Sequence, residues 1–216
     1  MEELDLERCL ARSAEGDQTA WQSLVTRFTP LLWAVARAHR LSDSDAADVV
    51  QATWLRLVEN LGRIREPERV GAWLATTCRR ECLSSLRRGS REQPVDHDRM
   101  IDIRDESTGS VDAALLREER DAVLWSVFED LSDPCRRLLR VLMADPPPSY
   151  EEVSSALDMP VGSIGPTRGR CLRRLHDLAV EAGISRDDAA SVSQTAPGTG
   201  TPSGTRSGAS TRGPTT

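Results

Sequence analysis

Apolar residues recur every three or four positions through the first 88 residues, a spacing that predicts helices. We expect a short helix over 4–14, a longer one over 18–40, and a pair over 45–61 and 68–88. Gly62 is expected to end the third helix, and Pro67 prevents it from continuing into the fourth. Pro30 falls inside the second helix and is expected to kink or interrupt it. Residues 1–88 are therefore predicted to form an all-helical domain.

The helices over 45–61 and 68–88 each have two distinct faces at about 100° per residue. In the first of them, the expected buried face is Ala47, Val50, Trp54, Leu57 and Leu61. In the second, an apolar face of Val70, Leu74, Cys78 and Cys82 lies opposite a basic stripe of Arg69, Thr76, Arg80, Leu83 and Arg87, with Trp73 at its border. Arginines beside an aromatic ring suit a nucleic-acid surface, although an ordinary solvated face has the same pattern.

The second half of the chain begins with a linker and ends with a tail. Residues 89–110 are rich in acidic residues and poor in apolar ones, so we expect a flexible acidic linker. Helices are expected again over 111–131 and from Pro134 to Leu142. Residues 183–216 contain mainly small and polar residues with proline, and we expect this tail to be disordered.

A helix-turn-helix pattern lies between the linker and the tail. Ser149 and Glu152 have the spacing of a capping box for a short helix, residues 158–162 form a turn, and a basic helix follows. The basic helix is expected to expose Ser163, Thr167, Arg170 and Arg174 and to bury Ile164, Cys171, Leu175 and Leu178. The second helix of such a pair enters the major groove of DNA, whereas the alternative is a plain helical hairpin. If Ser163 is the N-cap, Pro166 costs no hydrogen bond; if the helix begins at Val161, Pro166 costs one and kinks it.

The charge is divided unevenly along the chain. The formal net charge is −6, yet residues 63–91 contain eight arginines against three acidic residues, and residues 161–178 contain four against one. Two short basic segments in an acidic chain predict contact with DNA at two places. Every basic residue except the three histidines is arginine, which suits bidentate contacts, but a GC-rich genome gives the same bias and is the explanation we favour.

The sequence has few features of a membrane protein, a secreted protein, a metal-binding protein or an enzyme. It has no run of about 18 apolar residues, and its N-terminus is acidic rather than a basic signal region, so we expect a cytoplasmic protein without membrane contact. The five cysteines are scattered and are expected to be reduced, and no metal site is expected. No catalytic triad or phosphate-binding loop is apparent, so neither an enzyme nor a cofactor is expected.

Three segments together resemble a bacterial sigma factor of the extracytoplasmic-function (ECF) type, over about residues 4–182. Residues 45–56 are similar to the family's helix for binding core polymerase, residues 70–88 to its −10 promoter helix, and residues 150–175 to its −35 helix-turn-helix. The resemblance implies an all-α fold of two small domains: region 2 over 1–88 and region 4 over 111–182, joined by the linker. It also suggests an actinobacterium-like GC-rich source.

The resemblance further implies three sets of functional residues. The set for core polymerase comprises Asp45, Asp48, Gln51, Ala52 and Leu55. The set for the −10 element comprises Arg63, Arg65, Arg69, Trp73, Thr76, Arg80 and Arg87, and the set for the −35 element comprises Ser163, Thr167, Arg168, Arg170 and Arg174. The implied partners are core RNA polymerase, through its β′ clamp coiled coil and β flap, and promoter DNA, with an anti-sigma factor as a further candidate.

Two other hypotheses compete with the sigma factor. A helix-turn-helix regulator that does not act as a polymerase subunit explains the second basic segment but gives the face of residues 45–61 no role. An anti-sigma or other interaction module explains the helices but neither basic segment. Loss of polymerase binding on substitution of Asp48 and Gln51 separates the first hypothesis from a sigma factor.

Overall fold

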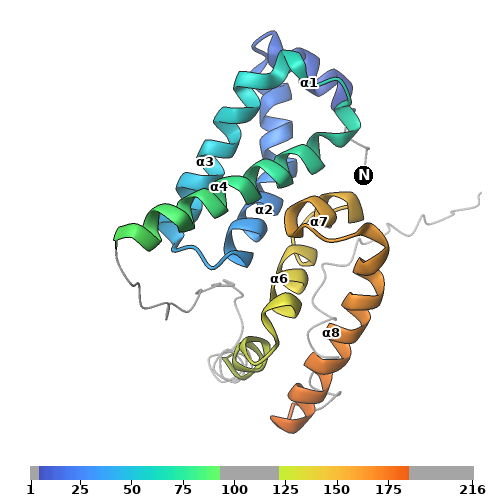
Figure 1. Cartoon of the computed structure of the whole chain (residues 1–216). Helices are drawn as coiled ribbons and strands as arrows, with labels where there is room; N and C mark the ends of the chain where they lie inside the picture. Colours follow the sequence, from blue (N-terminus) through green and yellow to red (C-terminus); the bar gives the residue numbers. More distant parts are fainter. Residues whose placement is uncertain (1–4, 93–121, 185–216) are drawn as a thin grey trace, which may run out of the picture.

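A computed structural model describes residues 5–92 and 122–184, and every regular element in these two ranges is a helix (Figure 1). The expected all-α class is confirmed. The first range contains α1 (Leu6–Ala14), α2 (Gln18–Ala38), α3 (Asp43–Asn60) and α4 (Val70–Glu92). In the second, residues 122–129 are helical and are followed by α6 (Asp133–Leu142), α7 (Tyr150–Leu157) and α8 (Val161–Glu181). None of the described helices is both long enough and apolar enough to span a membrane.

Helix α2 supplies the largest side chains to the core of the first four helices. Leu24, Phe28, Leu31 and Leu32 are all at most 2% exposed. The expected interruption at Pro30 is wrong, because α2 runs through this residue as one helix. The residues before and after Pro30 pack into the same core, and this burial outweighs the one backbone hydrogen bond that proline removes.

The buried face of α3 differs from the expected one. Ala47 is exposed, whereas Ala46, Val49 and Thr53 are buried with Val50 and Leu57. The expected face is thus rotated by about 60° around the helix axis. The buried Thr53 satisfies its hydroxyl by donating to the Val49 carbonyl at 2.8 Å, which is why a polar residue can occupy a core position.

Helix α4 buries the four residues expected on its apolar face, Val70, Leu74, Cys78 and Cys82, each 0% exposed. It ends at Glu92 rather than Arg88, so the first residues of the expected linker belong to this helix. The rest of the expected linker lies outside the described residues, as does most of the expected tail.

Helices α6 and α8 are joined by a disulfide between Cys135 and Cys171, which corrects the expectation of reduced cysteines. The two cysteines are 36 positions apart, and their spacing gives no sign of a pair; the packing of the helices brings their Cα atoms to 5.3 Å. Around this bond lies a small second core of Phe128, Leu131 and Leu139, with Leu175 and Leu178 packed against it. Of the predicted buried face of α8, Ile164 and Cys171 are buried, and Leu175 and Leu178 are half-buried against this core.

The two groups of helices also pack against each other. Helix α7 lies along α4 and α6 lies against α2 (Figure 1). Leu138, Val141, Val153 and Ile164 of the second group belong to the same buried cluster as the core of the first. This packing sets the surroundings of the site described next.

Candidate nucleic-acid interface

The turn between α3 and α4 exposes two arginines. It consists of two short 3₁₀ segments, Leu61–Arg63 and Pro67–Arg69, and Pro67 begins the second of them. Arg63 and Arg65 are exposed here, while Ile64 is half-buried against the core. Tight backbone geometry therefore places two cations beside the start of α4.

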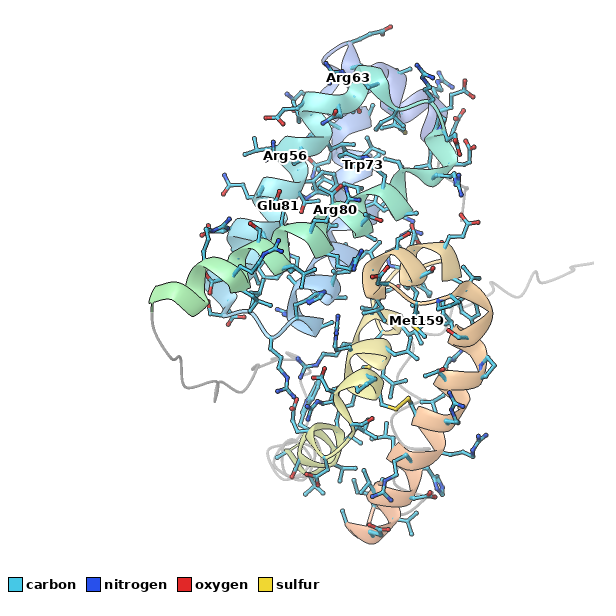
Figure 2. The ribbon with its side chains drawn as sticks, in the orientation of Figure 1. Arg56, Arg63, Trp73, Arg80, Glu81 and Met159 are labelled. Carbon is cyan, nitrogen blue, oxygen red and sulfur yellow. A yellow bond between two sulfur atoms is a disulfide. The ribbon has the colours of Figure 1, made fainter. Side chains whose placement is uncertain are left out.

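A groove of about 740 Å³ runs from this turn along α4. Six of the seven residues expected at the −10 element line it; Arg87, farther along α4, does not. Figure 2 shows Trp73 and Arg80 on the first half of α4. The lining comprises Asn60, Arg63, Ile64, Arg65, Glu66, Arg69, Val70, Ala72, Trp73, Thr76, Thr77, Arg80, Glu151, Ser154, Ser155 and Val161.

The groove combines apolar surface with positive charge. Trp73 is half-buried, and Ile64 and Val70 supply further apolar lining. Arg69 donates to Glu66 Oε2 at 2.8 Å, and this hydrogen bond, followed by the charges of Glu66 and Glu151, raises the pKa of Arg69. Arg63, Arg65 and Arg80 form no ion pair with another described residue. An aromatic ring among guanidinium groups is suited to hold a base and its phosphates.

The helix-turn-helix is formed by α7 and α8. The predicted capping box is present: Glu152 N donates to Ser149 Oγ at 3.2 Å, and Ser149 N donates to Glu152 Oε2 at 2.6 Å. Asp158 ends α7 in the left-handed region at φ 57°, and the Ser154 hydroxyl donates to the Met159 carbonyl at 2.7 Å. These contacts fix the turn, and Figure 2 marks Met159 within it.

Helix α8 begins at Val161, with Pro160 as its N-cap. Ser163 is thus inside the helix, and its hydroxyl donates to the Pro160 carbonyl at 2.7 Å. The helix therefore begins at Val161, as one of the two alternatives predicted, and the alternative with Ser163 as the N-cap is wrong. Pro166 lies in the helix interior, where it leaves the Gly162 carbonyl without its usual donor. Gly162 is exposed, so water can take the place of that donor.

Four of the residues expected at the −35 element, Ser163, Thr167, Arg170 and Arg174, lie within about 60° of one another around α8, whereas Arg168 lies about 100° or more from them. Arg168, Arg170 and Arg174 are exposed, and Ser163 and Thr167 are half-buried. Arg170 donates to the Thr167 hydroxyl at 3.1 Å. Ile164 and Cys171, at most 1% exposed, lie between Thr167 and Arg168 around the helix axis, so the buried face of α8 separates Arg168 from the other four residues.

The residues expected to meet core polymerase lie opposite the buried face of α3. Asp45, Asp48, Gln51 and Leu55 are exposed, and Ala52 is half-buried. Leu55 is 57% exposed, which is unusual for a leucine in the middle of an 18-residue helix. This surface is accessible to a partner.

Asn60, Ile64 and Glu151 also line the groove, although none of them belongs to the set expected from the sequence. Asn60 and Ile64 flank the Gly62 break, so their position next to the arginines could have been predicted. Glu151 could not, because it enters the groove through the packing of α7 on α4.

Comparison with known proteins gives consistent results. Residues 24–92 match the family described as Sigma-70 region 2. The chain is similar to the ECF RNA polymerase sigma-E factors of Salmonella typhimurium and Escherichia coli K12, at 25% identity over 170 residues that cover 76% of this chain and 88% of each relative.

Two solved structures have a similar fold. One is CnrH in complex with the cytosolic domain of CnrY, with a TM-score of 0.52, 25% identity, and coverage of 82% of this chain and 97% of that one. The other is the sigma factor RpoE of Bartonella quintana in complex with the anti-sigma factor NepR, with a TM-score of 0.53, 20% identity, and coverage of 73% and 95%.

The match over 24–92 covers most of α2 and all of α3 and α4, and it assigns a sigma-70 region 2 to this part of the chain. The relatives are ECF RNA polymerase sigma factors, so the two findings together support an ECF sigma factor.

Proposed function

We propose that this chain binds core RNA polymerase as its sigma subunit, reads the −10 element with the groove along α4 and the −35 element with α8, and promotes promoter melting. The observation that carries the proposal is the convergence of six residues of the −10 set, Trp73 among them, on one groove. The proposed units are region 2 over 1–88, a linker over 89–110, region 4 over 111–182 and a tail over 183–216.

The groove suits an unpaired strand better than a duplex. A flipped base can stack on the exposed part of Trp73, while Arg63, Arg65 and Arg80 hold the adjacent phosphates. Asn60 lines the groove and donates its side-chain amide to the Arg56 carbonyl at 2.8 Å, so its side-chain oxygen can accept a hydrogen bond from a base. Arg87 would contact the strand beyond the groove.

Helix α8 suits the major groove of duplex DNA. Its exposed guanidinium groups at Arg168, Arg170 and Arg174 can bind phosphates or the O6 and N7 acceptors of guanine. Ser163 and Thr167 lie at its N-terminal half, which is the part of a recognition helix that contacts bases.

The partners follow from this assignment. The exposed face of α3 around Leu55 would bind the β′ clamp coiled coil, and region 4 would bind the β flap. Two structural relatives were solved with the CnrY cytosolic domain and the anti-sigma factor NepR, so an anti-sigma factor is a further candidate. We place the protein in the cytoplasm, where polymerase and DNA are found, and in a GC-rich, actinobacterium-like bacterium in view of its arginine usage.

Binding to core polymerase tests the role of α3. Leu55→Asp puts a carboxylate into the proposed contact, and we expect it to reduce co-elution with core RNA polymerase in size-exclusion chromatography by more than tenfold, because an unpaired charge is costly in an apolar contact. Gln22→Asp introduces the same group at an exposed position of α2 and is expected to bind normally. Equal binding of both variants would contradict the assignment of α3.

A further inference from the structure

Arg173 points away from the core of the helix-turn-helix more directly than any other arginine of α8. At about 100° per residue, it lies about 180° from the buried Ile164 and about 160° from the buried Cys171 around the helix axis. Ser163 and Thr167 lie about 80° and 120° from Arg173, closer to the buried face. Arg173 does not belong to the −35 set expected from the sequence, yet its direction is that of a side chain that enters a DNA groove.

Arg173 belongs to an outward ridge of α8 that consists of Gly162, Pro166, Gly169 and Arg173. These residues follow one another at intervals of four, three and four positions, so they lie on one side of the helix. Glycine has no side chain, and the side chain of proline is an apolar ring. Among the four residues of the outward ridge, only Arg173 therefore has a side chain that can donate a hydrogen bond to a base edge.

The guanidinium group of Arg173 lies over the backbone at Gly169. A Cβ atom on Gly169 would lie 3.8 Å from Arg173 Nη1. This position is one turn closer to the N-terminus of α8 than residue 173 itself, as expected for helical side chains, which tilt in that direction. The group is thus directed toward the N-terminal part of α8, which is the part of a recognition helix that contacts bases.

The space in front of the outward ridge is open. A Cβ atom on Gly162 would meet no atom within 4 Å, and one on Gly169 would meet only Arg173. At Gly71 of α4, by contrast, a Cβ atom would collide with the Glu152 carboxylate of α7, so packing requires that glycine. No comparable contact with a described residue requires glycine on the outward ridge. A DNA duplex can therefore approach the backbone of α8 closely at these positions.

The charges around Arg173 leave its guanidinium group available to DNA. Arg173 is exposed and forms no ion pair with another described residue, whereas Arg174 Nη1 lies 4.0 Å from Glu181 Oε1. A guanidinium group can donate two parallel hydrogen bonds to O6 and N7 of guanine, the commonest specific contact in the major groove. Arg170 and Arg174 lie about 60° and 100° from Arg173 around the axis, so they face the phosphate backbone when Arg173 points at the bases.

We infer that Arg173 is the residue of α8 that determines specificity for a guanine in the −35 element, and that Gly169 leaves the room its guanidinium group needs. Arg170 and Arg174 bind phosphates and position the helix. This inference rests on the proposed function, which assigns the −35 element to α8 but does not distinguish among its arginines. It predicts a G·C base pair at which exchange reduces promoter activity about tenfold or more.

Run-off transcription by core RNA polymerase with the full-length protein tests the inference. The templates are a promoter mapped with the wild type and a set of duplexes in which each −35 base pair is exchanged in turn. Arg173→Ala should reduce run-off from the original promoter about tenfold or more, and its run-off should no longer depend on which base pair occupies the position of the guanine. At the other −35 positions, Arg173→Ala should discriminate as the wild type does.

Three further variants separate base reading from charge and bulk. Gly169→Leu keeps every charge but fills the space of the guanidinium group, so it should lose discrimination at the same base pair, with little further loss when combined with Arg173→Ala. Ala182→Leu adds the same side chain at the exposed C-terminal end of α8 and should behave as the wild type. Arg174→Ala should reduce run-off by one factor on every duplex, because a phosphate contact carries no sequence information. Circular dichroism of each variant checks that the helices are intact.

Unchanged discrimination by Arg173→Ala would overturn the inference. A loss of equal size on every duplex would also overturn it, because Arg173 would then bind a phosphate. Normal discrimination by Gly169→Leu would refute the role of Gly169. If the wild type gives no new start sites, the proposed function fails, and the same variants are then compared on the duplex that the full-length protein selects from a random library. A guanine preference that disappears with Arg173→Ala would still support the inference there, and its persistence or absence would overturn it.

Discussion

His39 provides a sensitive test of the contact between α2 and α6. It follows the last residue of α2, it is 9% exposed, and its Nε2 lies 3.4 Å from Arg137 Nη2. A guanidinium group can only donate, so Nε2 accepts and the neutral ring carries its proton on Nδ1. Burial, and then the charges of Arg137 and Arg79, lower the pKa of His39 from 6.5 to about 4, against a smaller opposite effect of Asp133.

The sign of the pH dependence follows from this pKa. Between pH 6.5 and pH 4 the unfolded chain binds a proton at His39 that the folded chain does not, so stability present above pH 6.5 is lost as the pH falls toward 4. With a pKa of 6.5 in the unfolded chain and about 4 in the folded chain, the free energy of unfolding falls by about 1.8 kcal/mol between pH 7 and pH 5. Partial access of water to the ring reduces the expected loss to about 1 kcal/mol.

Urea unfolding at pH 7 and pH 5, followed by circular dichroism, measures this loss. His39→Gln keeps an acceptor for Arg137 but cannot titrate, so its free energy of unfolding should fall by about 1 kcal/mol less than that of the wild type over this range. His176→Gln, at an exposed position of α8, should behave as the wild type does. Equal losses for the wild type and His39→Gln would refute the description of His39 as a buried neutral ring beside arginines.

Three further predictions concern the disulfide, the groove and the recognition helix. Reduction of Cys135–Cys171, whose cysteines are 36 positions apart, should lower the free energy of unfolding by up to about 4 kcal/mol, and a Cys135→Ala/Cys171→Ala variant should not respond to reductant; a response of the variant would place the effect elsewhere. Trp73→Leu keeps apolar packing but removes the stacking surface, so −10 strand binding should weaken by about 1–3 kcal/mol; unchanged binding would remove Trp73 from the site. Pro166→Ala should raise the free energy of unfolding by about 1–3 kcal/mol in thermal melts, because it restores a donor within α8; lower stability would mean that the proline ring packs favourably.

Local chemistry made several features predictable from the sequence. The buried face of α4 followed from Val70, Leu74 and Cys78 at helical spacing, and the capping box of α7 followed from Ser149 and Glu152. Each depends only on residues within one helix or its cap. The prediction for α3 was wrong at Ala47, because both alanine and threonine are compatible with either face and only tertiary packing decided between them.

Features that depend on long-range packing could not be predicted. Gly71 and Glu152 are unremarkable in their own helices, and only the approach of α7 to α4 gives them their shared role. The pairing of Cys135 with Cys171 and the position of Glu151 in the groove have the same origin. For the groove, the turn and α4 indicated the arginines and Trp73, but not the wall from α7.

The central claim is tested most directly by run-off transcription with purified core RNA polymerase on genomic promoter fragments, including the upstream region of this chain's own gene, with and without the protein. We predict start sites that appear only when the protein is added, that share −10 and −35 elements, and that are lost with Leu55→Asp but retained with Gln22→Asp. Binding of the protein to duplex DNA without new start sites and without polymerase association would contradict the account and favour a helix-turn-helix regulator.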